Sequence, residues 1–241
     1  MGGVFQILAR LQEALPDVYR HSLRTAKLVL GTSRYMCWDS AAVEAAVTAA
    51  LLHDVGKLRI DPLILCKPGR LTAAEWREMR QHPRYGLEML AGLRLPPGAL
   101  PGVLYHHERW DGQGYSGLKG DNIPPVARLL AVCDSWEAMT SPRVYQPRKT
   151  GPEARQELEQ MRGSQFDPAL VPFFLDMLQE EQSQNLIARL DQAREGLDWA
   201  FQMYRDLHNP VVYVASLLVD DLVLTDVTIQ CAATHPKAVE S

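Results

Sequence analysis

The sequence predicts an all-α fold over residues 1–181, and three observations support this prediction. Apolar residues recur at helical spacing along this stretch, short loops rich in proline and glycine separate the periodic runs, and no convincing strand alternation occurs before residue 210. The composition is that of a folded globular protein: 46% of the 241 residues are apolar and 22% are charged, which excludes a disordered chain.

The first helix is expected over residues 18–30, where apolar positions have helical spacing and Gly31 supplies a stop. An alanine-rich run follows, beginning at a cap provided by Asp39 or Ser40 and ending near Gly56. These two runs are expected to form the first two helices.

Two capping boxes indicate further helix starts. Thr72 with Glu75 predicts a helix through about Arg80, and Thr150 with Glu153 predicts another. In each pair the hydroxyl and the carboxylate can satisfy backbone N–H groups at the start of a helix, so these boundaries rest on a specific hydrogen-bond pattern.

Prolines delimit the remaining helices. Pro83 is expected to be the first residue of a helix that ends before Pro96, and a further helix is expected over about 100–108. Pro125 opens the next, and the Asp-Pro step at 167–168 is a cap followed by proline at the first helical position. The all-α domain is therefore expected to close near residue 181.

Residues 182–241 form a C-terminal extension in this prediction. Over residues 182–207 apolar side chains recur at steps of three and four, which fits either a helix packed on its own domain, the interpretation we favour, or a helix that forms a homodimer. Residues 211–230 are β-branched and apolar, and a two-stranded hairpin turning at 220–221 is one interpretation. Because aspartates interrupt this run, no membrane span is expected.

Ionisable side chains interrupt the apolar helices. His53 follows an alanine and leucine run, and Asp134 lies in an equally apolar stretch, where an unpaired charge is costly to bury. Each residue alone fits a structural role. Together, five imidazoles and two carboxylates at separate helix ends could hold two metal ions: His21, His53, Asp54, His82, His106, His107 and Asp134.

Several longer motifs include these residues. The most specific is HHERWDGQGYSGLKGDNIP at 106–124. The others are HSLRTAKL at 21–28, LLHDVGKL at 51–58, HPRYGLEML at 82–90, ARLLAVCDSWEAMTSPRVYQP at 127–147 and FDPALVPFF at 166–174. Over about residues 17–175 the sequence therefore resembles the HD-GYP family of cyclic dinucleotide phosphodiesterases, a branch of the HD metal-dependent phosphohydrolases.

The resemblance implies a helical bundle with a central metal site, over residues 1–181, and two divalent ions. His21, His53, Asp54 and Asp134 match the ligands of the basic HD site. His82, His106 and His107 match the ligands of a second metal, and Asp54 matches the carboxylate that bridges both. Nitrogen and oxygen ligands suit iron or manganese better than a thiolate zinc site. Some members hold a third metal; here the matching position is Asp17, which fits a helix cap equally well.

The implied reaction is hydrolysis of cyclic di-GMP, a bacterial second messenger, to linear pGpG and onward to GMP. The resemblance implies that a hydroxide bridging the metals attacks phosphorus, with Asp54 and Lys57 in catalytic positions. Arg143 matches a family residue that contacts phosphate. Other expected substrate contacts are Tyr115, Gly114, Arg109 and Lys119.

Three positions depart from the family pattern. Ser116 replaces the proline of the Gly-Tyr-Pro signature, which we therefore describe as a GYS variant. Gln146 replaces a basic residue, and Glu137 replaces an aspartate. We expect none of the three to contact the proposed ligands, so that the changes affect substrate affinity and specificity more than metal binding.

Two rival functions remain open: a non-catalytic module that binds a cyclic dinucleotide or docks a protein, and a phosphohydrolase acting on another nucleotide. The net charge of −4 argues against binding a nucleic acid duplex. The N-terminus lacks the order of a secretory signal and the four cysteines form no CxxC pair, so we expect a cytoplasmic protein. We expect no sensory module before His21, so that input would come through a signalling partner, the tail or expression level.

Overall fold

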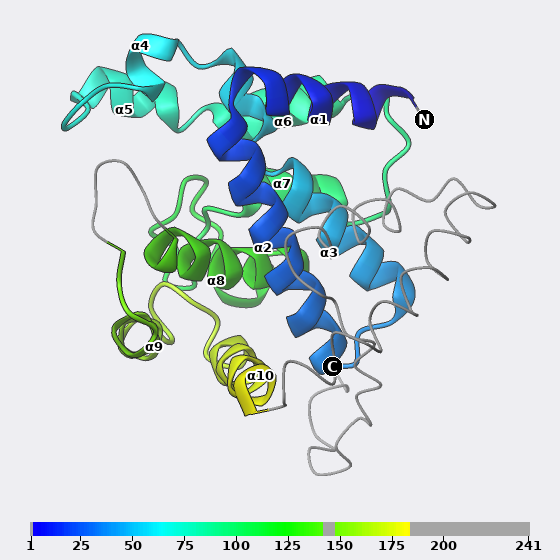
Figure 1. The fold of residues 1–241 in the computed structure, drawn as a ribbon, viewed down its shortest axis with the longest axis vertical. Coiled ribbons are helices and arrows are strands. Elements are labelled where there is room, and N and C mark those ends of the chain that lie inside the picture. The colour runs from blue at the N-terminus through cyan, green and yellow to red at the C-terminus, as the bar shows by residue number, and fades with distance from the viewer. Residues whose placement is uncertain (1, 142–147, 184–241) are drawn as a thin grey trace.

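The computed structural model describes residues 2–141 and 148–183, and this part of the chain confirms the predicted all-α fold (Figure 1). An isolated bridge between Arg162 and Phe166 is its one β-type pairing. The elements are α1 (Gly2–Ala14), α2 (Pro16–Tyr35), α3 (Ser40–Leu52), the 3-10 helix η1 (Val55–Arg59), α4 (Pro62–Leu65), α5 (Ala73–Met79), α6 (His82–Leu90), α7 (Ala99–Tyr105), the 3-10 helix η2 (Gly120–Asn122), α8 (Pro125–Thr140), α9 (Gly151–Gln160) and α10 (Leu170–Ser183).

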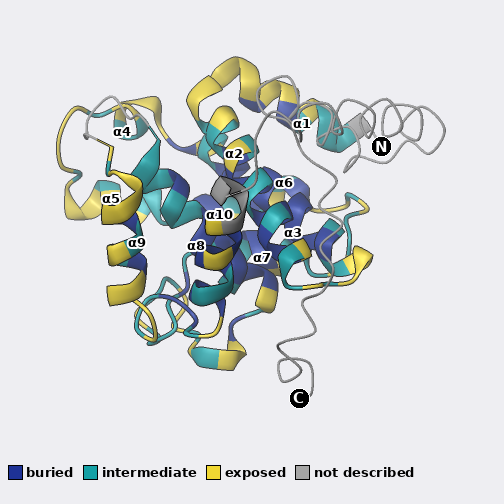
Figure 2. Cartoon of the chain, turned by 60° about the horizontal axis from the view of Figure 1, so that its bottom comes forward, coloured by how far each residue is buried: buried dark blue, intermediate teal, exposed yellow. Residues whose placement is uncertain are grey.

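Helices α2, α3, α7 and α8 pack against one another and form the centre of the bundle (Figures 1 and 2). The alanine-rich α3 is buried on almost every side, because its small side chains let neighbouring helices approach closely. Figure 2 shows the buried residues gathered in α3, α7 and α8, with exposed residues on α4, α5 and α9. α10 packs on α2 and α8, where the Phe174 ring meets Trp136 edge-on.

The expected caps are present where a side chain can satisfy the backbone. Asp39 accepts a hydrogen bond from the backbone N–H of Ala42. The capping boxes that begin at Thr72 and at Thr150 are both complete. These hydrogen bonds confirm three helix starts predicted from the sequence.

Several helix boundaries were predicted wrongly. α2 continues through Gly31 to Tyr35, because Thr32 and Ser33 are buried in the bundle and this packing outweighs the poor helix propensity of glycine. α3 ends at Leu52 rather than near Gly56, since η1 follows immediately. α6 begins at His82, one residue before the predicted start at Pro83, and α10 begins at Leu170 rather than at Pro168.

Residues 2–14 form α1, a helix that the sequence analysis did not predict, and its Leu8 and Leu11 are buried in the core. None of the helices in the described residues is both long and apolar enough to cross a membrane. The heptad-like run beyond Ser183, the hairpin and Arg143 lie outside the described residues.

Candidate metal centre

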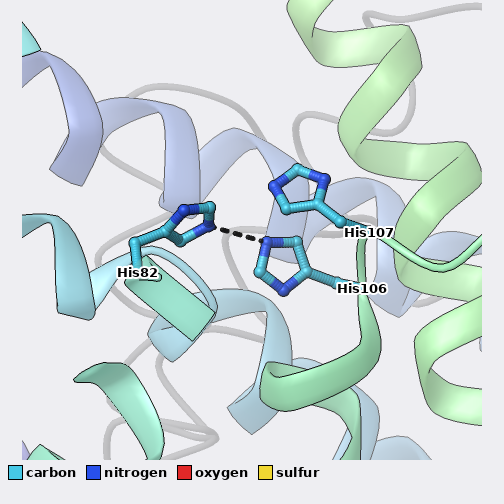
Figure 3. Close-up of side chains that lie close together, drawn as sticks. All are labelled: His82, His106 and His107. Carbon is cyan, nitrogen blue, oxygen red and sulfur yellow. Dashed lines mark hydrogen bonds between the residues drawn. The ribbon is translucent and has the colours of Figure 1, made fainter. Parts of the chain in front are cut away.

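Six of the predicted side chains meet in two adjoining groups inside the bundle. One group is His21, His53 and Asp54, and the other is His82, His106 and His107. Within each group the candidate ligand atoms lie within 4.8 Å of one another. Figure 3 shows the second group, whose three rings point toward a common centre. Asp134 joins the first group, with its Oδ1 2.8 Å from Nε2 of His21.

Three of the histidines are oriented by the same local device. The Nδ1 atoms of His53, His82 and His106 each lie 2.7–2.9 Å from the backbone carbonyl three residues earlier, at the C-terminal end of α3, α5 and α7 respectively. A carbonyl only accepts, so Nδ1 carries the hydrogen and the neutral ring presents the lone pair of Nε2 to the centre. This is the arrangement in which imidazole binds a metal.

These unprotonated nitrogens face one another at short distance. Nε2 of His82 lies 3.2 Å from Nε2 of His106 (Figure 3). With Nδ1 protonated in both rings, no hydrogen stands between them, so two lone pairs meet. Ligands bound to one metal at about 2.1 Å lie roughly 3 Å apart in octahedral geometry, so this spacing fits a shared cation.

Asp54 faces both groups with different oxygens. Its Oδ2 lies 3.4 Å from Nε2 of His53, and its Oδ1 lies 3.3 Å from Nε2 of His82. Oδ1 is buried without a hydrogen-bond partner. A buried carboxylate oxygen without a partner is costly, and a bound cation would satisfy it. The geometry therefore fits a carboxylate that bridges two ions.

A glycine in the HDVGK segment lets Asp54 approach the second group. A Cβ built on Gly56 would lie 1.9 Å from the backbone oxygen of His82 and 2.5 Å from the backbone nitrogen of Gly86. No larger residue fits there without moving η1 away from α6. The glycine thus permits the close packing that places Asp54 beside His82.

Burial sets the protonation of the second group. It lowers the pKa of His82 to about 4 and that of His107 to about 3, and it holds the pKa of His106 well below its usual value. These rings are therefore neutral at pH 7, as metal ligation requires. Burial alone would raise the pKa of Asp54, but the Lys57 ammonium 2.5 Å away and nearby imidazoles hold it well below its usual range.

The pKa of His21 is shifted in the opposite direction to those of the second group, because carboxylates flank both of its ring nitrogens. Burial lowers its pKa, but hydrogen bonds to Asp134 and Glu137 outweigh this and raise the pKa to about 9 in the metal-free chain. A cation held at Nε2 would displace the proton there, while Nδ1 would keep its hydrogen. Nδ1 donates to Glu137, which is 3% exposed and also accepts from Nε of Arg24. Our expectation that Glu137 does not contact the proposed ligands was therefore wrong. Asp134 and Glu137 are one helical turn apart on α8, a spacing that could have revealed the shared partner.

The loop after α7 closes over this centre. The Glu108 carboxylate, 4% exposed, accepts from the backbone N–H groups of Ser116 at 2.6 Å and of Leu118 at 2.8 Å. Gly114 packs so closely that a Cβ there would lie 2.6 Å from Cα of Glu108. The Tyr115 ring rests 4.7 Å from the His107 ring, between centroids. The loop is thus tied directly to the metal centre.

Arg80 holds the same loop from its outer side. Its guanidinium lies 4.4 Å from the centre of the Tyr115 ring, and Nη2 donates to the backbone oxygen of Gly114 at 3.2 Å. Neither Arg80 nor Glu108 was predicted to be a site residue. Glu108 adjoins the double histidine within the most specific motif, whereas no pattern along the chain indicated Arg80.

Comparison with known proteins now decides the family. The HD domain family model matches residues 7–170, more than half of the chain. The chain belongs to the HD domain family. Curated relatives include a "Cyclic di-GMP phosphodiesterase" of Thermotoga maritima, 38% identical over 181 residues, which covers 73% of this chain and 49% of the relative. A protein of the same name from Vibrio cholerae is 37% identical over 171 residues, covering 64% and 35%. These relatives confirm the predicted likeness to the HD-GYP branch.

A third relative is the "3'3'-cGAMP-specific phosphodiesterase 2" of Vibrio cholerae, 42% identical over 131 residues, covering 53% of this chain and 25% of that protein. This HD domain thus spans less than half the length of each of the three relatives. Two solved structures share the fold. A HDG"Y"P protein from Bdellovibrio bacteriovorus has a TM-score of 0.56 at 18% identity, covering 67% and 52%. The PgpH HD domain of L. monocytogenes has a TM-score of 0.53 at 16% identity, covering 75% and 98%.

The HD domain places the remaining predicted residues in different surroundings. Tyr115 and Gly114 border the centre, as described above. Arg109 binds both carboxylate oxygens of Asp111 and donates to Gln165, so its charge is already paired. Lys119 is exposed at the start of η2. Asp17 is 82% exposed in the first turn of α2 and pairs with Arg20, so the structure does not bring it into either group.

Proposed function

We propose that this HD domain is a metal-dependent phosphodiesterase that opens cyclic di-GMP to linear pGpG, with GMP as a further product. The observation that carries the proposal is Asp54, whose two oxygens face two separate imidazole groups. The curated relatives named for this activity support the choice of substrate. Two ions held by these residues would supply the charge stabilisation that hydrolysis of a phosphodiester needs.

The proposed cofactors are two divalent ions, iron or manganese. Seven nitrogen and oxygen donors, without a thiolate among them, favour these metals over structural zinc. When bound, such ions lower the pKa of a water molecule and neutralise charge on the phosphate. His21, His53, Asp54 and Asp134 would hold one ion. His82, His106, His107 and the other oxygen of Asp54 would hold the second.

The remaining roles belong to groups beside the donors. Lys57 is 23% exposed, with its Nζ 2.5 Å from Oδ2 of Asp54, and its ammonium can stabilise the scissile phosphate or donate a proton to the leaving oxygen. Gly114 and Tyr115 form the wall beside His107 and would limit how the dinucleotide enters. Arg143 is the proposed contact for a phosphate of the dinucleotide.

A second candidate substrate is another cyclic dinucleotide, which the cGAMP-specific relative supports. Ser116 lies within the loop beside the centre, and its backbone N–H is held by Glu108. A change in this loop would alter the selection between cyclic di-GMP and cGAMP as substrate. The rival idea of a binding module without turnover is disfavoured, because the chain keeps all seven candidate donors and their proximity supports a site that can bind metal.

The test is metal analysis of the purified full chain coupled to hydrolysis assays. We expect about two ions of iron or manganese per chain and faster turnover of cyclic di-GMP than of cGAMP at equal concentration. His106→Ala should abolish hydrolysis and release metal, whereas His235→Ala, which alters a histidine outside the motifs, should change neither. Binding of cyclic di-GMP by the metal-loaded protein without any product would refute catalysis. Faster turnover of cGAMP would instead identify the second candidate.

A further inference from the structure

A basic cavity lies beside the metal centre, between α5, α6 and the loop that carries Tyr115. Its volume is about 570 Å³, within the range of small-molecule sites. Three arginines line it, Arg77, Arg80 and Arg84, together with Leu104, Tyr115 and Ser116. None of the ligand histidines lines the cavity, so it is distinct from the two imidazole groups.

The arginines of this cavity are not paired with a carboxylate among the residues that the structure describes. Of the carboxylates carried by α5 and α6, Glu75 pairs with Lys67 and Glu88 pairs with Arg59. Glu78 accepts a hydrogen bond from the neutral Tyr85 hydroxyl and keeps its charge. Three guanidinium groups around one cavity, in a chain of net charge −4, mark a place suited to an anion.

The chemistry of the lining specifies the anion further. Guanidinium groups match phosphate oxygens with paired hydrogen bonds, which favours phosphate over a smaller anion. Arg80 already has a fixed orientation, because it lies over the Tyr115 ring and donates to the backbone oxygen of Gly114. The cavity is larger than a phosphate group needs, and Leu104 supplies an apolar wall for an organic remainder. These features fit a nucleotide.

We propose that this cavity binds the phosphate of a nucleotide at a site separate from the metals. Tyr115 connects the two places, since its ring lies between the His107 ring and the Arg80 guanidinium. The nucleotide is either the half of a dinucleotide that extends away from the metals or a separate molecule. The choice of a guanine nucleotide as the probe rests on the proposed function. The assignment of a phosphate site rests only on the charge and shape of the cavity.

The experiment measures binding of GMP to the full chain by isothermal titration calorimetry. The test variant is Arg77→Gln/Arg84→Gln, because both side chains are exposed and can be replaced without disturbing the core. The matched control is Arg70→Gln/Arg94→Gln, which removes the same charge from exposed positions outside the cavity. We expect the dissociation constant to rise at least tenfold in the test variant and to stay unchanged in the control. Equal affinities in the two variants would overturn the proposal.

Two further measurements separate this site from the metal centre. Guanosine, which lacks the phosphate, should bind at least tenfold more weakly than GMP; equal binding would overturn the phosphate assignment. His106→Ala, which disturbs the second metal group, should retain GMP binding, and loss of binding would place the phosphate on the metals instead.

These binding results are independent of turnover, so failure of the hydrolysis assay would leave them interpretable. Displacement of GMP by cyclic di-GMP in the His106→Ala protein would identify the dinucleotide as the occupant, and no displacement would identify a separate nucleotide.

Discussion

Replacing Gly56 by alanine would separate Asp54 from the second histidine group. The added Cβ would lie 1.9 Å from the backbone oxygen of His82, whereas ordinary contacts begin at 3.4 Å. Because the obstacle is backbone, η1 and α6 must move apart by 1.5 Å, the difference between these two distances. Ligand positions need to be correct within about 0.5 Å, so this shift should disrupt the second metal site. Overpacking of this kind costs about 1–3 kcal/mol of unfolding free energy.

Two measurements on Gly56→Ala check this reasoning. For a chain of this size the predicted loss corresponds to a fall in Tm of roughly 2–12 °C. Metal analysis should show loss of at least one of the two expected ions. The matched control is Gly151→Ala, because a Cβ at Gly151 meets nothing within 4 Å. If Gly56→Ala kept the Tm and metal content of the control, the steric explanation of this glycine would be wrong.

Three other substitutions test the groups around the centre. Glu137→Gln removes the negative charge that contacts both His21 and Arg24. We expect metal affinity to fall by about 10–100-fold in a chelator competition, with little change in the circular dichroism spectrum. Unchanged affinity would contradict a role in orienting His21. Glu108→Gln leaves a single amide oxygen for the backbone N–H groups of Ser116 and Leu118. We therefore expect the free energy of unfolding to fall by about 1–3 kcal/mol in chemical denaturation, and KM to rise. Wild-type values for both would show that the loop does not depend on this carboxylate. Asp17→Asn should leave metal content unchanged, because the Asp17 side chain is 82% exposed and pairs with Arg20; loss of one ion would instead support a third metal.

The helical fold and the donor set were predictable because both leave local signals. The capping boxes at Thr72 and Thr150 depend on residues three positions apart, and the structure has them as expected. Gly31 shows where local signals fail. Its propensity indicates a helix end, but the burial of Thr32 and Ser33 in the bundle, with Thr32 in contact with Cys133 of α8, continues α2. Those contacts depend on the whole bundle and leave no mark near residue 31.

The surroundings of the donors were less predictable than the donors themselves. Arg109 was predicted to contact substrate, yet Asp111, two residues along, binds its guanidinium. Glu137 was predicted not to contact the ligands, yet its carboxylate accepts a hydrogen bond from His21. Arg80 and Tyr115 are far apart in sequence, so only folding reveals that the guanidinium covers the ring. A resemblance in motifs identifies residue types, whereas the partner of each side chain depends on the folded chain: on the shape of one loop for Arg109, and on the packing of α2 against α8 for Glu137.

The histidine orientation also connects helix termination with ligand chemistry. The last carbonyls of a helix have no partner within it, and His53, His82 and His106 each donate Nδ1–H to such a carbonyl. One hydrogen bond therefore satisfies a helix end and fixes the tautomer that exposes Nε2. Since the helix ends of α3, α5 and α7 meet at one place, folding brings several unprotonated nitrogens together whose lone pairs repel one another. A cation bound among them relieves that repulsion, so the same contacts that complete the helices make the folded chain receptive to metal.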